Sequence, residues 1–148
     1  MDRGTAVVLT AAAGGLIALQ APINGHLAGT VGNLQATFVS FVVGTVVLAA
    51  ILALAHGGYG QLGEVRHVSS WIYLTGGLLG AAYVTVALVA VRTLGAGGVT
   101  AATFAGQLAL SLVVDQLGLL GVDKQPITAS KVLGVALLAA GVFFIVRD

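Results

Sequence analysis

The stretch that decides the fold is residues 4–63, GTAVVLTAAAGGLIALQAPINGHLAGTVGNLQATFVSFVVGTVVLAAILALAHGGYGQLG, which contains no Asp, Glu, Lys or Arg. A water-soluble domain is about 25% charged. The whole chain of 148 residues is only 7% charged and is 58% hydrophobic, with a mean hydropathy of +1.07. A surface with so few charges suits lipid rather than water, so the sequence predicts an integral membrane protein.

Turn residues and charges divide the chain into five apolar segments, each near the roughly 20 residues that cross a bilayer as a helix. The predicted spans are 5–27, 32–55, 70–92, 98–120 and 127–146. Inside a bilayer every backbone N–H and C=O must be paired within the protein, which favours helix, and the alternating polar residues of a β-barrel are missing. We therefore expect residues 1–148 to form a single all-α membrane domain of five transmembrane helices.

The composition argues against several functional classes. The chain has no Cys, and its three His show no i, i+4 pair, so we expect neither a metal site nor a cofactor. A net charge of +1 without a basic cluster argues against nucleic acid as a partner. The sequence shows no paired carboxylates and no Ser/His/Asp set, so we expect no enzyme, and it lacks the P-loop motif of ATP-driven proteins.

The basic residues distribute almost evenly over the two membrane surfaces. With five spans, one surface receives Arg3, Arg66, Lys124 and Lys131, and the other receives Arg92 and Arg147. The positive-inside rule predicts orientation from this difference, and a difference of two residues favours one orientation only slightly. Two alternatives stay open: a fixed orientation with the N-terminus inside, or dual topology, in which copies insert both ways and pair antiparallel.

Transporters are often built from inverted repeats around a site at the bilayer midplane. This chain shows no internal repeat long enough to supply both halves. We therefore expect the second half to come from a second copy, as an antiparallel homodimer, or from an oppositely oriented paralogue.

The first span carries polar residues that lipid excludes. Gln20 and Asn24 are four residues apart and share a helix face. Pro22 lies between them and cannot donate to the carbonyl of Ala18. Freed backbone inside a membrane is tolerated only against protein or a watery cavity. We predict a broken helix whose amides line a substrate cavity; interhelical hydrogen bonds beside a structural kink are the alternative.

The fourth span carries a polar stripe made of Gln107, Ser111 and Asp115, spaced four and four so that they lie on one helix face. Such a stripe cannot face lipid and must face a protein partner or a cavity. We therefore predict that these three residues bind substrate.

Asp115 is the acidic residue inside a predicted span, and an intramembrane carboxylate is a functional candidate by default. A carboxylate at this depth would suit proton coupling. Lys131 lies at a similar depth near the start of the fifth span, so a structural Asp115–Lys131 ion pair is the alternative. In an antiparallel dimer, Arg92 of the second copy also comes round to the Asp115 side.

Two further residues complete the substrate-binding candidates. Ser40 lies with Thr37, Phe41 and Gly44 at helical spacing on the second span, where its hydroxyl either lines a pocket or bonds to the preceding turn. Tyr83 lies deep in the third span, where its hydroxyl needs a partner, as a core hydrogen bond or a pocket wall.

Four segments carry a family resemblance: Gln20-Ala-Pro-Ile-Asn24-Gly25, Ser40-Phe41-Val-Val-Gly44, Gln107 through Ser111 to Asp115-Gln-Leu-Gly118, and Gly134 through Leu137 to Gly141-Val142. Their order and spacing resemble the YdcZ-like small five-helix family of the drug/metabolite transporter superfamily, over residues 5–146. The resemblance implies a small-molecule transporter of ten helices, fused or as an antiparallel pair of five-helix subunits, in the bacterial inner membrane.

These observations favour a secondary transporter of a small polar or amine-like metabolite. It would work by alternating access, with a midplane site at an antiparallel homodimer interface. One alternative is a passive small-solute channel, which would show flux without saturation or counterflow. Another is an accessory membrane subunit without transport of its own.

Overall fold

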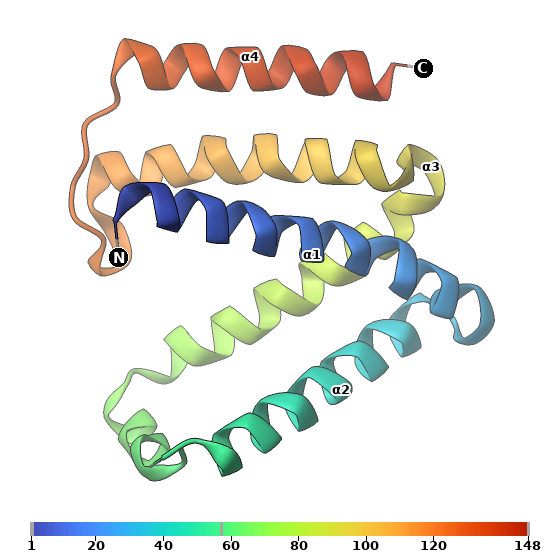
Figure 1. The fold of residues 1–148 in the computed structure, drawn as a ribbon, viewed down its shortest axis with the longest axis vertical. Coiled ribbons are helices and arrows are strands. Elements are labelled where there is room, and N and C mark those ends of the chain that lie inside the picture. Colours follow the sequence, from blue (N-terminus) through green and yellow to red (C-terminus); the bar gives the residue numbers. More distant parts are fainter. Residues whose placement is uncertain (1, 57, 148) are drawn as a thin grey trace. The chain divides into compact units, whose positions relative to one another are not determined.

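The computed structural model describes residues 2–56 and 58–147. The elements are α1 (Arg3–Val31), α2 (Asn33–Leu54), the 3-10 helix η1 (Gly60–His67), α3 (Ser70–Leu117), the short η2 (Leu119–Gly121) and α4 (Ala129–Val146) (Figure 1). The chain forms two compact units, Met1–Arg92 and Thr93–Asp148, called here the first and the second unit. The single domain expected from the sequence stays a prediction.

Helices α1, α2, α3 and α4 are each long and apolar enough to cross a membrane. Helix α3 has 48 residues, which at 1.5 Å per residue would reach about 72 Å, more than twice the thickness of a hydrocarbon core. Its backbone breaks at Gly95, where φ is 67° and ψ is 173°. Residues 70–94 and 96–117 are therefore two helices, and the five helices predicted from the sequence are confirmed.

Several expectations about the helices differ from the structure. The first span was expected to end at Leu27, but α1 continues to Val31 and ends before Gly32, where φ is 95°. The fourth span was expected to reach Leu120, but α3 ends at Leu117 because Gly118 takes the left-handed conformation (φ 64°, ψ 40°), and its N–H donates to the Asp115 carbonyl (3.3 Å). The expected break at Pro22 is wrong, since α1 continues through it. Proline removes one backbone donor, but its fixed φ is helical, so the surrounding turns hold the helix together.

Side-chain caps define the start of two helices. At α1, the Asp2 carboxylate accepts hydrogen bonds from the Thr5 N–H (2.9 Å) and the Thr5 hydroxyl (2.6 Å). These bonds favour the ionised carboxylate and lower the pKa of Asp2 below its usual 3.8. At α4, the Thr128 hydroxyl accepts a bond from the Lys131 N–H (3.3 Å), so both helices begin with their first-turn donors partly satisfied.

The core of the first unit lies where α1, α2 and the first half of α3 meet. Ala28, Ala36, Val84 and Leu88 are buried together there, with Leu27 packed against them. Gly32 joins α1 to α2 with φ at 95°, a conformation that favours glycine. Small residues let helix backbones approach closely in a membrane, where packing rather than hydrophobicity drives association.

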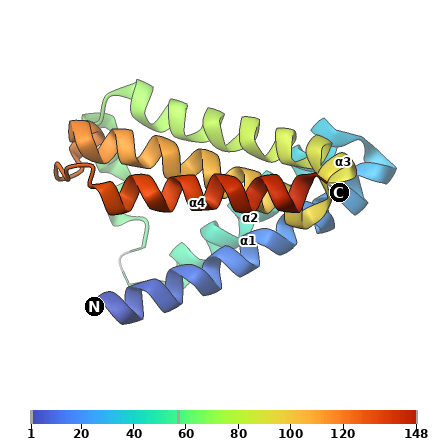
Figure 2. The same ribbon diagram turned by 90° about the horizontal axis from the view of Figure 1, so that it is seen from above.

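In the second unit, residues 96–117 of α3 and the helix α4 run side by side in both ribbon views (Figures 1 and 2). Gly98 marks close packing, since a Cβ there would lie 3.6 Å from a Val146 methyl group. The connection between the two helices folds back onto the end of α3, because the Gln125 N–H donates to the Asp115 carbonyl (2.8 Å). The second unit is thus a hairpin of two helices with a tied loop.

Candidate functional site

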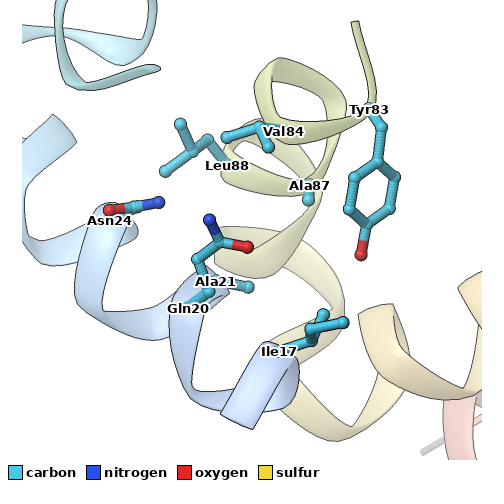
Figure 3. A pocket seen from close by; sticks show the side chains of 8 residues that line it. All are labelled: Ile17, Gln20, Ala21, Asn24, Tyr83, Val84, Ala87 and Leu88. Carbon is cyan, nitrogen blue, oxygen red and sulfur yellow. The ribbon is translucent and has the colours of Figure 1, made fainter. Parts of the chain in front are cut away.

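A cleft in the first unit lies between α1 and the first half of α3 (Figure 3). Four residues from each helix line it: Ile17, Gln20, Ala21 and Asn24 from α1, and Tyr83, Val84, Ala87 and Leu88 from α3. The spacing on α1 is i, i+3, i+4 and i+7, so one face of the helix forms the wall. The cleft brings together three of the predicted substrate-binding residues, Gln20, Asn24 and Tyr83.

The polar groups of the cleft are amides and a phenol. The side chain of Gln20 extends from α1 toward α3, while the Tyr83 ring extends from α3 with its hydroxyl toward Ile17 (Figure 3). Asn24 is 7% exposed. None of the eight lining residues is Asp, Glu, Lys, Arg or His. The cleft can therefore donate and accept hydrogen bonds without presenting a formal charge.

Ser40 contributes to this site indirectly. Its hydroxyl oxygen accepts a hydrogen bond from the Asn24 side-chain amide, at 3.1 Å between Nδ2 and Oγ. Ser40 is not among the lining residues. Asn24 therefore both bonds to α2 and lines the cleft, so the interhelical hydrogen bond and the place in a cavity wall, which the sequence left as alternatives, occur together at Asn24.

A second polar contact ties α2 to α3. The Thr85 hydroxyl lies 3.3 Å from the Thr37 hydroxyl, which can accept its hydrogen. Thr37 is buried and donates to the Asn33 carbonyl (3.0 Å). The side-chain oxygen of Asn33 is buried without a hydrogen-bond partner among the described residues. Thr85 was missed in the sequence because a threonine in an apolar helix can satisfy itself on the preceding turn. The Ala81 carbonyl lies 2.8 Å from the Thr85 hydroxyl, whose single hydrogen is donated either to Ala81 or to Thr37.

The cleft is small. The volume that the centre of a water-sized sphere can occupy in the cleft is ≈ 10 Å³. A volume of this size holds about one water molecule. Pockets for small metabolites usually measure roughly 300–1,000 Å³. In this conformation the cleft of the first unit is a small and largely apolar notch that carries two amides and a phenol. It has to widen, or to be extended by further walls, before it can hold a metabolite.

The predicted stripe lies on the second half of α3, in the second unit. Gln107 and Ser111 are exposed and Asp115 is half-buried. The Ser111 hydroxyl donates to the Leu108 carbonyl of its own helix (3.0 Å). The stripe is therefore left uncovered by α4 within its own unit, although an amide and a carboxylate on a membrane helix need protein or water beside them.

Asp115 and Lys131 lie at the same end of the second unit, as expected from the sequence. Asp115 is two residues before the end of α3, and Lys131 is the third residue of α4. The Lys131 ammonium donates to the Pro126 carbonyl (3.3 Å) rather than to the Asp115 carboxylate. The Asp115–Lys131 ion pair stays a prediction, and this conformation does not display it.

Sequence reasoning overlooked Gln116, the neighbour of Asp115. Its side-chain oxygen accepts a hydrogen bond from the Ile127 N–H (2.6 Å) and so holds the loop against the end of α3. The available signal was an amide directly before the Leu117-Gly118 helix end. Gln116 fixes the backbone that carries Asp115.

Comparison with known proteins gives one match. A family model described as "Putative inner membrane exporter, YdcZ" matches residues 5–144. No curated protein and no solved structure matched the chain. The matched region includes the cleft of the first unit and the stripe of the second, and it confirms the resemblance found in the sequence. The chain therefore belongs to the YdcZ family and is a multi-pass transport protein of the inner membrane.

Proposed function

We propose that the chain is a secondary transporter of a small polar or amine-like metabolite. It works by alternating access, and two copies paired antiparallel form the substrate site at their interface. The observation that carries this proposal is the cleft of the first unit, in which Gln20, Asn24 and Tyr83 gather between two membrane helices of an exporter-family chain.

The chemistry of the cleft supports a polar substrate. A polar group that leaves water for a membrane site loses several kcal/mol unless the protein replaces its hydrogen bonds. The Gln20 amide and the Tyr83 hydroxyl can replace them, and Ser40 holds the Asn24 amide in place. Asp115 favours an amine as the polar group of the substrate, because a substrate cation would be attracted to its carboxylate.

Two observations support a second copy. The cleft of the first unit has room for about one water rather than a metabolite. The stripe of the second unit exposes Gln107 and Ser111 on a helix that crosses lipid. Five spans in one orientation and five in the other give the inverted halves whose rocking produces alternating access.

Transport should depend on the two amides of α1. We expect cells that express the wild-type chain to accumulate at least one polar solute in the medium, and the Gln20→Ala/Asn24→Ala variant to slow this export roughly tenfold or more. Two lost hydrogen bonds of about 0.5–1.5 kcal/mol each justify that factor. The measurement is untargeted mass spectrometry of the medium, at equal amounts of membrane-inserted protein.

Gln35→Ala is the matched control, because it also removes an amide from the first unit but Gln35 does not line the cleft. It should export at the wild-type rate. If the double variant exported as fast as wild type, the cleft would not be the site. Counterflow of the same solute in proteoliposomes separates a transporter from a channel, and purified protein that moves nothing would indicate an accessory subunit.

A further inference from the structure

The carboxylate of Asp115 has no partner among the described residues of its own unit. No hydrogen bond or ion pair from the described residues reaches it, and the nearby Lys131 is engaged by the Pro126 carbonyl. Asp115 is half-buried at the end of a membrane helix. A carboxylate at that depth is costly unless a cation or donors compensate it.

The guanidinium of Arg92 also has no charge partner among the described residues. Arg92 is exposed on the first half of α3, and no hydrogen bond or ion pair from the described residues reaches it. Arg92 and Asp115 are the two charged residues of α3, one on each side of the break at Gly95. Their charges are opposite, and neither charge is compensated by a described residue of its own unit.

Chain geometry prevents these two residues from pairing within one copy. From Ala96 to Asp115 the helix rises about 29 Å, at 1.5 Å per residue. Arg92 precedes Ala96 by four residues, which reach at most about 14 Å when fully extended. The remaining distance of about 15 Å exceeds the length of an arginine side chain, so an Arg92–Asp115 contact requires two copies.

An inverted second copy supplies that contact. In a five-span chain, Arg92 lies near the end of the third span and Asp115 near the end of the fourth, so the two residues belong to opposite membrane surfaces. In an antiparallel copy the surfaces exchange, and Arg92 of the second copy lies on the surface of Asp115. The second copy also brings its Arg147 to that surface, but Arg147 already lies over the Phe144 ring at 4.8 Å.

We propose that Asp115 of one copy forms an ion pair with Arg92 of an antiparallel second copy. This inference rests on the assembly proposed above and adds the residues that fix its register. A two-fold axis repeats the contact, so one dimer contains two such pairs. The pairing also turns the stripe of Gln107 and Ser111 toward the second copy. These polar side chains then contact protein instead of lipid.

Cysteine cross-linking tests the pairing directly, because the natural chain has no Cys. Arg92→Cys and Asp115→Cys chains with different tags are co-expressed, and membranes are treated with a short bifunctional thiol reagent. We expect a covalent dimer that carries both tags. Each variant expressed alone should give at least fivefold less dimer, since like positions then lie on opposite surfaces, about 30 Å apart.

Val113→Cys replaces Asp115→Cys in the matched control, because Val113 is exposed on the same helix two residues away and points to another side. It should cross-link to Arg92→Cys at least fivefold less. Dominant dimers of Asp115→Cys with itself, or equal yields for Val113→Cys and Asp115→Cys, would overturn the proposal.

Charge reversal gives a second test that does not depend on transport. Arg92→Asp and Asp115→Arg should each reduce co-purification of two tagged copies several-fold, and the double variant should restore it to within about twofold. A double variant as defective as the single ones would overturn the pairing. The two proposals can fail separately. If the cross-links form and the double variant restores co-purification, but the protein transports no solute, the proposed function is refuted and the ion pair is supported.

Discussion

Replacing Gly95 by alanine should lower the free energy of unfolding by about 1–3 kcal/mol, the typical cost of a residue held in a backbone region that is essentially reserved for glycine. Gly95 has φ at 67° and ψ at 173°, and a Cβ built on it meets no atom within 4 Å. The cost therefore comes from backbone conformation and not from a steric clash. Thermal unfolding of the detergent-purified protein measures it.

Gly97→Ala is the control for this prediction. Gly97 lies two residues after Gly95, within the helix of residues 96–117. Its φ is not positive, and a Cβ there also meets nothing within 4 Å. Alanine is favoured over glycine in a helix by up to about 1 kcal/mol, so this variant should be as stable as wild type or more stable. Equal loss in both variants would show that the break at Gly95 does not need glycine.

Leu88→Ala should destabilise the first unit by about 2 kcal/mol. Leu88 is 0% exposed in the core with Ala28, Ala36 and Val84. In a soluble protein this substitution costs about 2–5 kcal/mol, from lost transfer energy plus a cavity. Lipid tails are as apolar as leucine, so in a membrane only the packing loss remains, which places the expected value at the low end. Unfolding in mixed micelles with increasing SDS measures it.

Leu79→Ala provides the comparison, since Leu79 is 64% exposed on the same half of α3. It loses lipid contacts rather than protein contacts, so its stability should stay within about 0.5 kcal/mol of wild type. If Leu79→Ala cost as much as Leu88→Ala, the packing of α3 against α1 and α2 would have to be revised.

The helices could be predicted from the sequence because a chain that crosses lipid must pair its backbone internally and expose apolar side chains. A charge-free stretch from residue 4 to residue 63 requires apolar spans, and the cluster Leu94-Gly95-Ala96-Gly97 marked the place where α3 breaks. The exact ends could not be predicted. Gly118 ends α3 three residues before the predicted limit, because its backbone is left-handed. Glycine permits this conformation, but the presence of a glycine in the sequence does not predict it.

The candidate site was predictable in its residues and not in its contacts. The four-residue spacing of Gln20 and Asn24 placed both amides on one face, and that face lines the cleft. Spacing along one helix does not tell which other helix lies opposite. The bond from Asn24 to Ser40 and the place of Tyr83 across the cleft therefore appear only in the structure. At Pro22 the sequence predicted a break that the structure does not contain, because the fixed φ of proline is compatible with a continuous helix.

The orientation of the chain in the membrane tests the central claim most directly. Gly63 lies in the loop between α2 and α3, where an added Cβ meets nothing within 4 Å, and the natural chain has no Cys. Intact cells that express Gly63→Cys are labelled with a membrane-impermeant maleimide, before and after permeabilisation. We predict labelling of about half of the copies from outside, as an antiparallel homodimer requires. Labelling of all copies or of none would show one fixed orientation and contradict a substrate site built from two inverted copies of this chain.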